Sequence, residues 1–372
     1  MNLELDKYQD YKEKTLSGRY ITNESVSKLK KSYNFSIIGK SSNDLPIFSL
    51  KMGTGPVKIL IWSQMHGNES TSTKALFDCL SFFDKYETNV FSKVTLMIVP
   101  ILNPDGAAKY TRENFNNVDL NRDAQLLTQI ESKILRNLHD LFIPDFCFNL
   151  HDQRTIYSVK NKNSSILSFL SPSADTKKSE TKSRKDSMKV IALIKSKLSL
   201  IIPDNISRYN DDYNKNCVGD TFQSLNTSTI LFESGHTGRD YKREKTREYM
   251  CYALIYSIKS IVFKDFVKVN YKDYYLIPEN TCYLCDMFLR NVKINNDNSQ
   301  LKVDVCIMFK EVLDTVKKEI KFEPYIYKHG NLPNMSGHLI IDFNTIDKVF
   351  KISNNLVANE LIKHVNKLRI IQ

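Results

Sequence analysis

The chain has 372 residues, of which 41% are hydrophobic and 26% charged, and it carries a formal net charge of +11. This length favours one large domain plus a smaller one, and no run reaches the roughly 18 apolar residues that a membrane-spanning helix needs. Basic residues are spread among acidic ones along the whole chain, so we expect no nucleic-acid partner. The lysine-rich segment 176–189 is expected to be a solvated loop and the start of a helix, and not a binding arm.

The seven cysteines are odd in number and lie in apolar surroundings, which is typical of reduced, packed thiols. Cys282 and Cys285 form a single C-x-x-C motif without a second pair, so we expect two strand residues and not a metal site. The first residues lack the charged-then-apolar pattern of a secretory signal. We therefore expect a cytoplasmic protein without a membrane partner, and no pattern predicts its oligomeric state.

In chain order, residues 8–33 are predicted to be helical with loops. Two strands at 33–41 and 46–53 follow, and the turn-forming "SNDL" between them predicts a hairpin. The continuous apolar run at 57–64 is typical of a strand buried on both faces, and 72–86 have helical periodicity.

The same alternation of buried strands and periodic helices continues for two hundred residues. The predicted segments are a strand and turn at 93–106, a helix at 124–142, a strand at 145–152, a helix at 189–198, a strand at 228–234 and a helix at 243–262. Strands that alternate with helices form largely parallel sheets. The predicted fold class is therefore α/β, with a mostly parallel mixed sheet flanked by helices and a smaller β-rich C-terminal domain.

The pattern of hydrophobic and turn-forming residues changes near residue 269. Strand-like pieces with Asn-rich turns occur at 273–310 and 336–343, and helical periodicity returns only at 354–371. We predict a main domain at residues 1–265, whose first 33 residues are a helical extension, and a β-rich accessory domain at residues 269–372.

Four residues able to bind a metal or move a proton follow the predicted buried strands. His66 and Glu69 come after one strand, His151 ends a second and Glu233 ends a third. Ligands of open α/β sheets bind beyond the carboxyl ends of the strands, so these side chains should meet at one edge. His66, Glu69 and His151 would supply the three protein ligands of a catalytic zinc ion. Glu233 would be the general base that takes a proton from water and passes it to the leaving nitrogen.

The segment "LNPDGAAKYTRENFNNVDLNRDAQ" lies between these strands. Arg112, Asn121 and Arg122 are donors suited to a carboxylate or a developing oxyanion. Asp119 is a candidate acceptor for the second ring nitrogen of His66, because ligating histidines generally donate that N–H to a carboxylate. Taken singly, each residue has a structural explanation as a turn, helix-terminal or capping residue. Their joint occurrence in this order argues for a site.

The motifs "HGNE", "NPDG", "TREN…NVDLNRD", "NLH" and "FESG" occur in this order along the chain. Together they resemble the zinc metallocarboxypeptidases of the carboxypeptidase A type, a family with a two-histidine, one-glutamate zinc site, over about residues 33–262. The resemblance implies a carboxypeptidase-like fold and the following roles: His66, Glu69 and His151 as ligands of one zinc ion, Arg112 as polariser of the scissile carbonyl, Asn121 and Arg122 as the clamp on a substrate carboxylate, Glu233 as the catalytic carboxylate, and Asp119 as the partner beside the zinc ligands.

The sequence departs from this family after the Asn-Arg pair. Asp123 and Ala124 stand where the digestive members have another Asn and an aromatic residue. We expect the acid beside Arg122 to weaken or reshape the carboxylate clamp. The "LNRD" form also looks more like the amidase and deacylase branches of the wider superfamily.

The family's active-site tyrosine falls in "RYNDDYNKNCVGD". Tyr213 is the predicted residue, with Tyr209 as the alternative. Asp211 and Asp212 nearby are expected to favour a cationic group on the substrate.

The predicted function is a zinc-dependent hydrolase that cleaves an amide bond, as a metallocarboxypeptidase acting on peptides or peptide-like substrates with a free carboxylate. A cytosolic amidase for peptidoglycan fragments or acylated amino acids is the alternative, motivated by "NRDA". A non-catalytic binding module on the same fold is a second alternative, against which the full ligand set and Glu233 argue.

Overall fold

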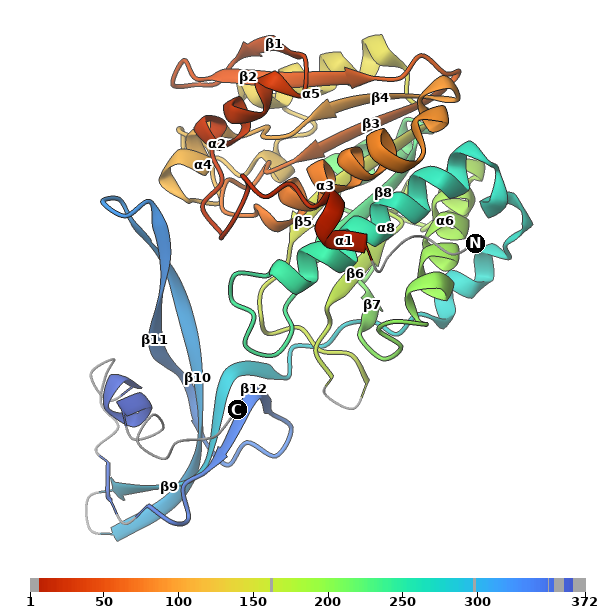
Figure 1. The fold of residues 1–372 in the computed structure, drawn as a ribbon. Coiled ribbons are helices and arrows are strands. Elements are labelled where there is room, and N and C mark those ends of the chain that lie inside the picture. The colour runs from red at the N-terminus through yellow and green to blue at the C-terminus, as the bar shows by residue number, and fades with distance from the viewer. Residues whose placement is uncertain (1–6, 161–162, 297–298, 347, 351–357, 364–372) are drawn as a thin grey trace.

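The computed structural model describes residues 7–160, 163–296, 299–346, 348–350 and 358–363 (Figure 1). It contains an eight-stranded sheet with helices on both faces and a four-stranded sheet near the C-terminal end. The predicted fold class is confirmed. Within the described ranges, no helix is both long and apolar enough to cross a membrane.

The large sheet has the strand order β1-β2-β4-β3-β5-β8-β6-β7. Neighbours among β4, β3, β5 and β8 run parallel, whereas the β1–β2, β2–β4 and β6–β8 pairs are antiparallel. The strands are β1 (Phe35–Lys40), β2 (Pro46–Met52), β3 (Val57–Ser63), β4 (Val94–Val99), β5 (Phe146–Asp152), β6 (Leu167–Leu170), β7 (Ile206–Arg208) and β8 (Ser228–Ser234). The predicted hairpin is β1–β2, and the short strands β6 and β7 were not predicted.

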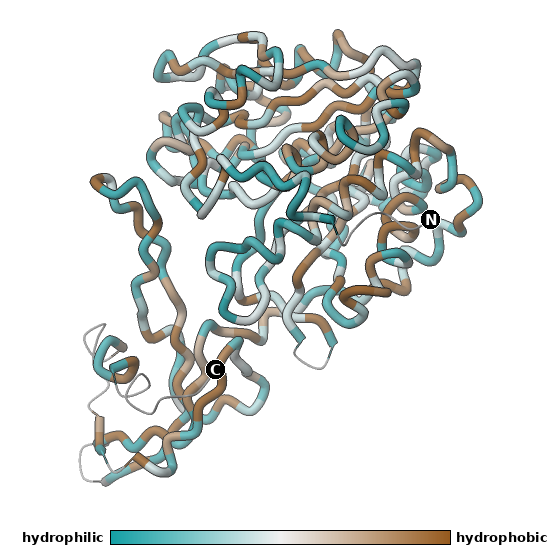
Figure 2. The backbone as a smooth tube through the Cα atoms, viewed as in Figure 1, coloured by the Kyte–Doolittle hydropathy of each residue, from teal (hydrophilic) through white to brown (hydrophobic). Residues whose placement is uncertain are grey.

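Both faces of the central strands are covered, which explains their continuous apolar runs. In β3, Ile59 and Ile61 belong to the core on one side of the sheet, while Leu60 and Trp62 belong to the core on the other side. β5 is buried at every position. Hydrophobic residues accordingly run along the central strands in Figure 2. A parallel strand of this kind must be apolar on both sides because helices pack on each face.

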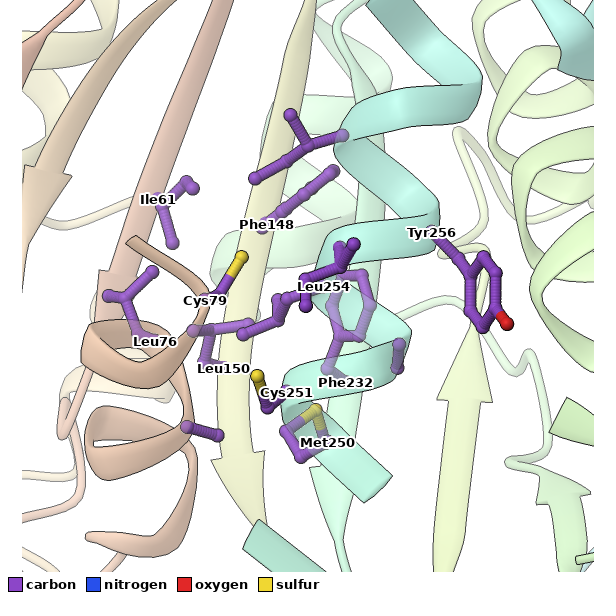
Figure 3. Packing of buried hydrophobic residues seen from close by; sticks show 14 of the residues in the cluster. Ile61, Leu76, Cys79, Phe148, Leu150, Phe232, Met250, Cys251, Leu254 and Tyr256 are labelled. Carbon is purple, nitrogen blue, oxygen red and sulfur yellow. The ribbon is translucent and has the colours of Figure 1, made fainter. Parts of the chain in front are cut away.

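One face of the large sheet carries α3 (Thr71–Tyr86), α6 (Lys182–Leu198) and α8 (Glu244–Val262). Side chains of α3 and α8 interdigitate with those of β3, β5 and β8 (Figure 3). The other face carries α5 (Ile130–Phe142) and α7 (Val218–Ser224), where Trp62 meets Phe222 edge to face at 5.5 Å. Shorter elements are α4 (Pro104–Lys109) and the 3-10 turns Thr88–Ser92, Leu120–Arg122, Asp265–Lys268 and Tyr271–Leu276.

Two helices begin at other residues than the apolar periodicity predicts, although the start of α6 falls inside the lysine-rich segment as expected. α5 begins at Ile130 and not at 124, because the preceding residues form a turn in which Leu127 has a φ of 49°. α6 begins at Lys182, inside the lysine-rich segment, where the Thr181 hydroxyl caps the helix by accepting from the Arg184 N–H.

The N-terminal extension consists of α1 (Tyr8–Tyr11), α2 (Asn23–Ser27) and a 3-10 turn at Lys28–Lys31. A fully buried ion pair between Arg247 of α8 and Asp78 of α3 holds it in place. The Arg247 guanidinium donates to the carbonyl oxygens of Glu13 and Leu16, and Asp78 accepts from the Tyr8 hydroxyl at 2.7 Å.

The small sheet has the order β11-β10-β9-β12, in which only the β12–β9 pair is parallel. Its strands are β9 (Leu284–Asn296), β10 (Ser299–Asp314), β11 (Glu319–Gly330) and β12 (Ser336–Asp342). β9, β10 and β12 occupy the predicted strand-like pieces, whereas β11 was not predicted. Of the expected final helix at 354–371, residues 358–363 are helical and the others lie outside the described ranges.

The two sheets are joined by packing and by backbone hydrogen bonds. The Ser158 N–H donates to Thr281 at 2.7 Å, and the Leu284 N–H donates to Ile156 at 3.2 Å. Ile156 packs in one hydrophobic cluster with Cys285, Phe288, Cys306 and Met308 of the small sheet. The long β10–β11 hairpin extends from this junction alongside the main domain (Figure 1).

Candidate active site

The turn after β3 places His66 and Glu69 on the same side of the chain. The Glu69 N–H donates to the His66 carbonyl at 3.1 Å, and the Gln64 side chain donates to Gly67 O at 2.9 Å. Gly67 passes so close to α4 that a Cβ there would lie 1.9 Å from the Gly106 carbonyl carbon. Only glycine fits at this position, which explains the G in "HGNE".

His66, Glu69 and His151 form one buried cluster. The two Glu69 oxygens lie 2.8 Å from His66 Nδ1 and 2.8 Å from His151 Nδ1, and the two Nδ1 atoms are 3.2 Å apart. One ligand atom from each residue lies within 4.8 Å of the others. Nitrogen ligands at about 2.0–2.1 Å from a tetrahedral zinc ion are roughly 3.3–3.4 Å apart, so both the donor set and its spacing fit zinc.

Two aspartates hold these residues in position. Asp119 Oδ1 lies 3.0 Å from His66 Nε2, which leaves Nδ1 facing the cluster, as the sequence predicted. The Asp152 N–H donates to Glu69 Oε2 at 3.1 Å. The Asp152 carboxylate accepts from the N–H groups of Thr71 and Ser72, and it thereby caps α3, the helix that follows Glu69.

Burial disfavours the charged form of all three cluster residues, whereas contacts between them shift their pKa values as well. The two histidines hold the pKa of Glu69 well below its usual value despite burial. Burial lowers the pKa of His151, whereas Glu69 and Asp119 raise the pKa of His66 against burial. The cluster therefore offers an ionised carboxylate and a neutral imidazole at His151.

Glu233 on β8 lies opposite His151 of β5 in the sheet register. Burial, together with the negative charges of Glu69 and Asp152, raises the pKa of Glu233 well above its usual value. Its Oε2 atom is inaccessible to solvent and has no hydrogen-bond partner among the described residues. A carboxyl group in this state can bind and release a proton beside the metal ligands.

Arg112 reaches the cluster from the loop after α4. Its Nε and Nη2 atoms donate to Asp119 Oδ2 at 3.1 and 3.0 Å, and Nη1 lies 3.4 Å from Glu69 Oε1. Asp119 also accepts from the Asn121 N–H at 2.8 Å. One aspartate thus orients the histidine, the arginine and the backbone of the following loop.

Asn121 and Arg122 lie on the 3-10 turn that Asp119 begins. Asn121 Oδ1 accepts from the Val218 N–H at 3.0 Å, so its Nδ2 group is left to donate. The exposed Arg122 guanidinium donates to the Asn121 carbonyl at 2.8 Å and contacts Cys217 Sγ at 3.2 Å.

The expected effect of Asp123 on Arg122 finds no support in the contacts of this carboxylate. The Asp123 carboxylate is buried and turned away from the site, where it accepts two hydrogen bonds from Thr128 and one from the Gln129 N–H. It stabilises the turn before α5 and does not pair with Arg122.

Of the two candidate tyrosines, Tyr209 has contacts that lead to the site. Its hydroxyl donates to Gln153 Oε1 at 3.0 Å, its ring packs on Tyr157, and burial together with the Glu233 charge raises its pKa. Tyr213 is half-buried on the loop before α7, and its role stays a prediction.

Asp211 and Asp212 already pair with cations of the chain. Asp211 binds Arg184 and Lys178, and Asp212 binds Lys178 at 2.7 Å. The expected preference for a cationic substrate group therefore finds no support in these two acids.

Sequence reasoning missed Asp152 and Arg19. Arg19 is buried and donates to Thr71 Oγ1 at 2.8 Å and to Asp152 Oδ2 at 3.1 Å, which fixes the carboxylate that caps α3. Asp152 directly follows His151, so the acid in "NLHD" was an available signal. No sequence signal marked Arg19, because it is about fifty residues away from the nearest predicted site residue.

The fold and the metal cluster together define the class of zinc-dependent hydrolases with a two-histidine, one-carboxylate site. The particular family is settled by residues 23–267, which match the family described as "Zinc carboxypeptidase". The chain belongs to this family, and the family's zinc site corresponds to the His66–Glu69–His151 triad.

Individual relatives cover shorter stretches. The chain is 30% identical over 128 residues to carboxypeptidase SOL1 of Arabidopsis thaliana, which is 29% of this chain and 26% of that protein. It is 29% identical over 100 residues to carboxypeptidase 2 of Trichophyton tonsurans, which is 26% of this chain and 19% of that protein. The matched regions thus span about a quarter or less of the length of these curated relatives.

Solved structures share the fold at low identity. A metallo-carboxypeptidase from Burkholderia cenocepacia superposes with a TM-score of 0.52 at 15% identity, over 66% of this chain and 70% of that one. The carboxypeptidase A from Helicoverpa armigera gives 0.52 at 13% identity, over 70% and 80%. A likeness at this level of identity concerns the fold alone.

Proposed function

We propose that this protein is a zinc carboxypeptidase that hydrolyses the last amide bond of a peptide with a free C-terminal carboxylate. The observation that carries the proposal is the meeting of the His66–Glu69–His151 cluster with Glu233 at the carboxyl ends of β3, β5 and β8. Membership of the zinc carboxypeptidase family supports it.

Glu233 is the group that moves the proton. When bound, zinc supplies a Lewis acid that polarises the scissile carbonyl and lowers the pKa of water. Glu233 takes the proton from the attacking water and delivers it to the leaving nitrogen, for which its position opposite His151 and its raised pKa are suited.

Arg112 stabilises the negative charge that develops on the carbonyl oxygen. Its guanidinium is held by two hydrogen bonds to Asp119, so it is oriented before the substrate arrives. Preorganised donors of this kind stabilise an oxyanion without a reorganisation cost.

Asn121 and Arg122 bind the substrate carboxylate. Because Asn121 Oδ1 accepts from the Val218 N–H, the Nδ2 group of Asn121 is left to donate to the carboxylate. Arg122 supplies the positive charge. Because Asp123 binds Thr128 and Gln129, it does not neutralise this charge.

Product identification tests the proposal. The purified protein, with its zinc content measured, is incubated with a mixed pool of peptides and muropeptides, and the products are identified by mass spectrometry. Release of single C-terminal residues from peptides is expected. Cleavage of muropeptides alone would replace the proposal by the amidase reaction, and zinc-loaded protein that cleaves neither would overturn it.

A further inference from the structure

A cavity of about 1010 Å³ lies between the small sheet and Glu69, the residue of the metal cluster that lines it. One wall comes from the main domain and includes Glu69, Arg112 and residues 152–155. The opposite wall comes from the β10–β11 hairpin, with residues 308–311 and 323–325. The small sheet therefore borders the same space as a metal ligand.

The middle of the hairpin is packed against the main domain. Met308 belongs to the hydrophobic cluster of Ile156, five residues after the ligand His151. Phe309 and Phe322 contact the ring of Tyr241 with centroid distances of 5.1 and 5.2 Å. These contacts bury aromatic surface and hold both strands of the hairpin.

Polar contacts connect the hairpin to the turn that carries Glu69. The Glu311 carboxylate accepts from Arg19 Nη2 at 3.2 and 3.3 Å and from the Tyr110 hydroxyl. Arg19 also donates to Asp152, whose backbone N–H donates to Glu69. At the tip, Lys318 Nζ lies 2.8 Å from Glu24 of α2, although this exposed pair contributes little.

The direction in which the substrate runs follows from the proposed function, on which this inference rests. Residues 121 and 122, which bind the C-terminal carboxylate, do not line the cavity, whereas Glu69, Arg112 and residues 152–155 do. The part of the peptide that precedes the cleaved bond must therefore extend into the cavity and towards the hairpin. Pockets that enclose a small ligand measure roughly 300–1,000 Å³, so this space holds a few residues.

We infer that the β10–β11 hairpin is a wall that restricts the enzyme to short peptides. Residues that precede the cleaved bond occupy the cavity, and a longer chain meets the hairpin. Lys310 and Glu323, which face each other across the two strands, line the cavity and contact the upstream residues of longer substrates, which a dipeptide lacks.

A peptide ladder tests this inference. Peptides of two, four, eight and sixteen residues share the same two C-terminal residues, and kcat/KM is measured for each. We expect kcat/KM to fall roughly tenfold or more from the short to the long peptides. Equal values for all lengths would overturn the inference and leave the proposed function intact. If no peptide of any length is cleaved, it is the proposed function that has failed.

Two matched variants locate the effect on the hairpin. Lys310→Trp narrows the cavity at an exposed position, and Lys317→Trp places the same side chain on the exposed turn of the hairpin, away from the cavity. We expect Lys310→Trp to lower kcat/KM for the four-residue peptide at least fivefold while the dipeptide changes less than twofold. Lys317→Trp should leave both unchanged. Equal effects of the two variants would contradict the assigned wall.

Discussion

The Nδ1 atoms of His66 and His151 lie 3.2 Å apart, and the carboxylate of Glu69 contacts both of them. Two imidazole nitrogens at this distance repel each other when both present lone pairs, and a shared cation removes the repulsion. The cluster is therefore less stable without a metal than with one.

Zinc binding should accordingly stabilise the fold. A ligand at one hundred times its Kd adds about 2.7 kcal/mol to the free energy of unfolding, so we expect chelation to lower Tm by roughly 5 °C or more. Thermal unfolding with chelator, and again after zinc is restored, measures this shift. Glu233→Gln should keep the shift and His151→Ala should lose it; a His151→Ala protein with the full shift would contradict the ligand set.

Substitution of Glu233 should remove the proton-transfer step and leave the metal in place. We expect Glu233→Gln to lower kcat roughly a thousandfold, because general acid–base catalysis contributes about 10²–10⁴-fold. Zinc stoichiometry should stay at the wild-type value. Glu319→Gln, at an exposed position on β11, is the control and should be fully active. A Glu233→Gln enzyme of near-normal rate would exclude the proposed mechanism.

Arg112 and Arg122 should differ in the kinetic parameter that they change. Arg112 reaches the metal cluster, so Arg112→Ala should lower kcat by about a hundredfold, as loss of an oxyanion donor does. Within the described residues, the contacts of Arg122 are to Asn121 and Cys217, away from the metal cluster, so Arg122→Ala should raise KM and change kcat little. Steady-state kinetics on one short peptide measures both, and the reverse pattern would exchange the two assigned roles.

Asp123 should affect stability and not substrate binding. Asp123→Ala removes three hydrogen bonds to Thr128 and Gln129 from a buried position, so we expect a loss of about 1–3 kcal/mol in the free energy of unfolding. Urea denaturation measures this loss. KM at a temperature well below Tm should match the wild-type value, and a changed KM would show that Asp123 acts on the clamp.

Asp220 on α7 should make stability depend on pH. Burial raises its pKa from 3.8 to about 7, so between these values the folded state binds more protons than the unfolded state and stability falls as pH rises. The Asn oxygen can still accept from the Ser173 N–H. Asp220→Asn should therefore be more stable than wild type at pH 8 by roughly 2–4 kcal/mol, and the difference should disappear near pH 4. Urea denaturation at both values checks this, and a constant difference would contradict the assignment.

The large sheet and the metal cluster could be predicted because their signals are local. Buried parallel strands carry continuous apolar runs, as at residues 59–62 of β3 and 146–148 of β5, and the residues at their carboxyl ends meet at one edge. His66 and His151 are eighty-five residues apart in sequence, yet topology alone places them together. The family resemblance added the roles of Arg112, Asn121 and Arg122, which composition does not reveal.

The features that the sequence did not predict depend on tertiary contacts. β6 and β7 are four and three residues long, too short for a periodic signal. The acidic residue Asp123 was visible in the sequence, but the direction in which its side chain points depends on the turn before α5. Arg19 joins the site only because the N-terminal extension lies over α3. The domain boundaries, the role of Tyr213 and the cytoplasmic location stay predictions.

Two backbone hydrogen bonds connect the segment that follows His151 with the segment that leads into the small sheet. The Ser158 N–H donates to the Thr281 carbonyl, and the Leu284 N–H donates to the Ile156 carbonyl. A protein that ended after α8 would leave Ile156 and Tyr157 facing water within a few positions of a zinc ligand. The small sheet thus covers residues next to the metal cluster, and a shortened form of this protein should keep both sheets.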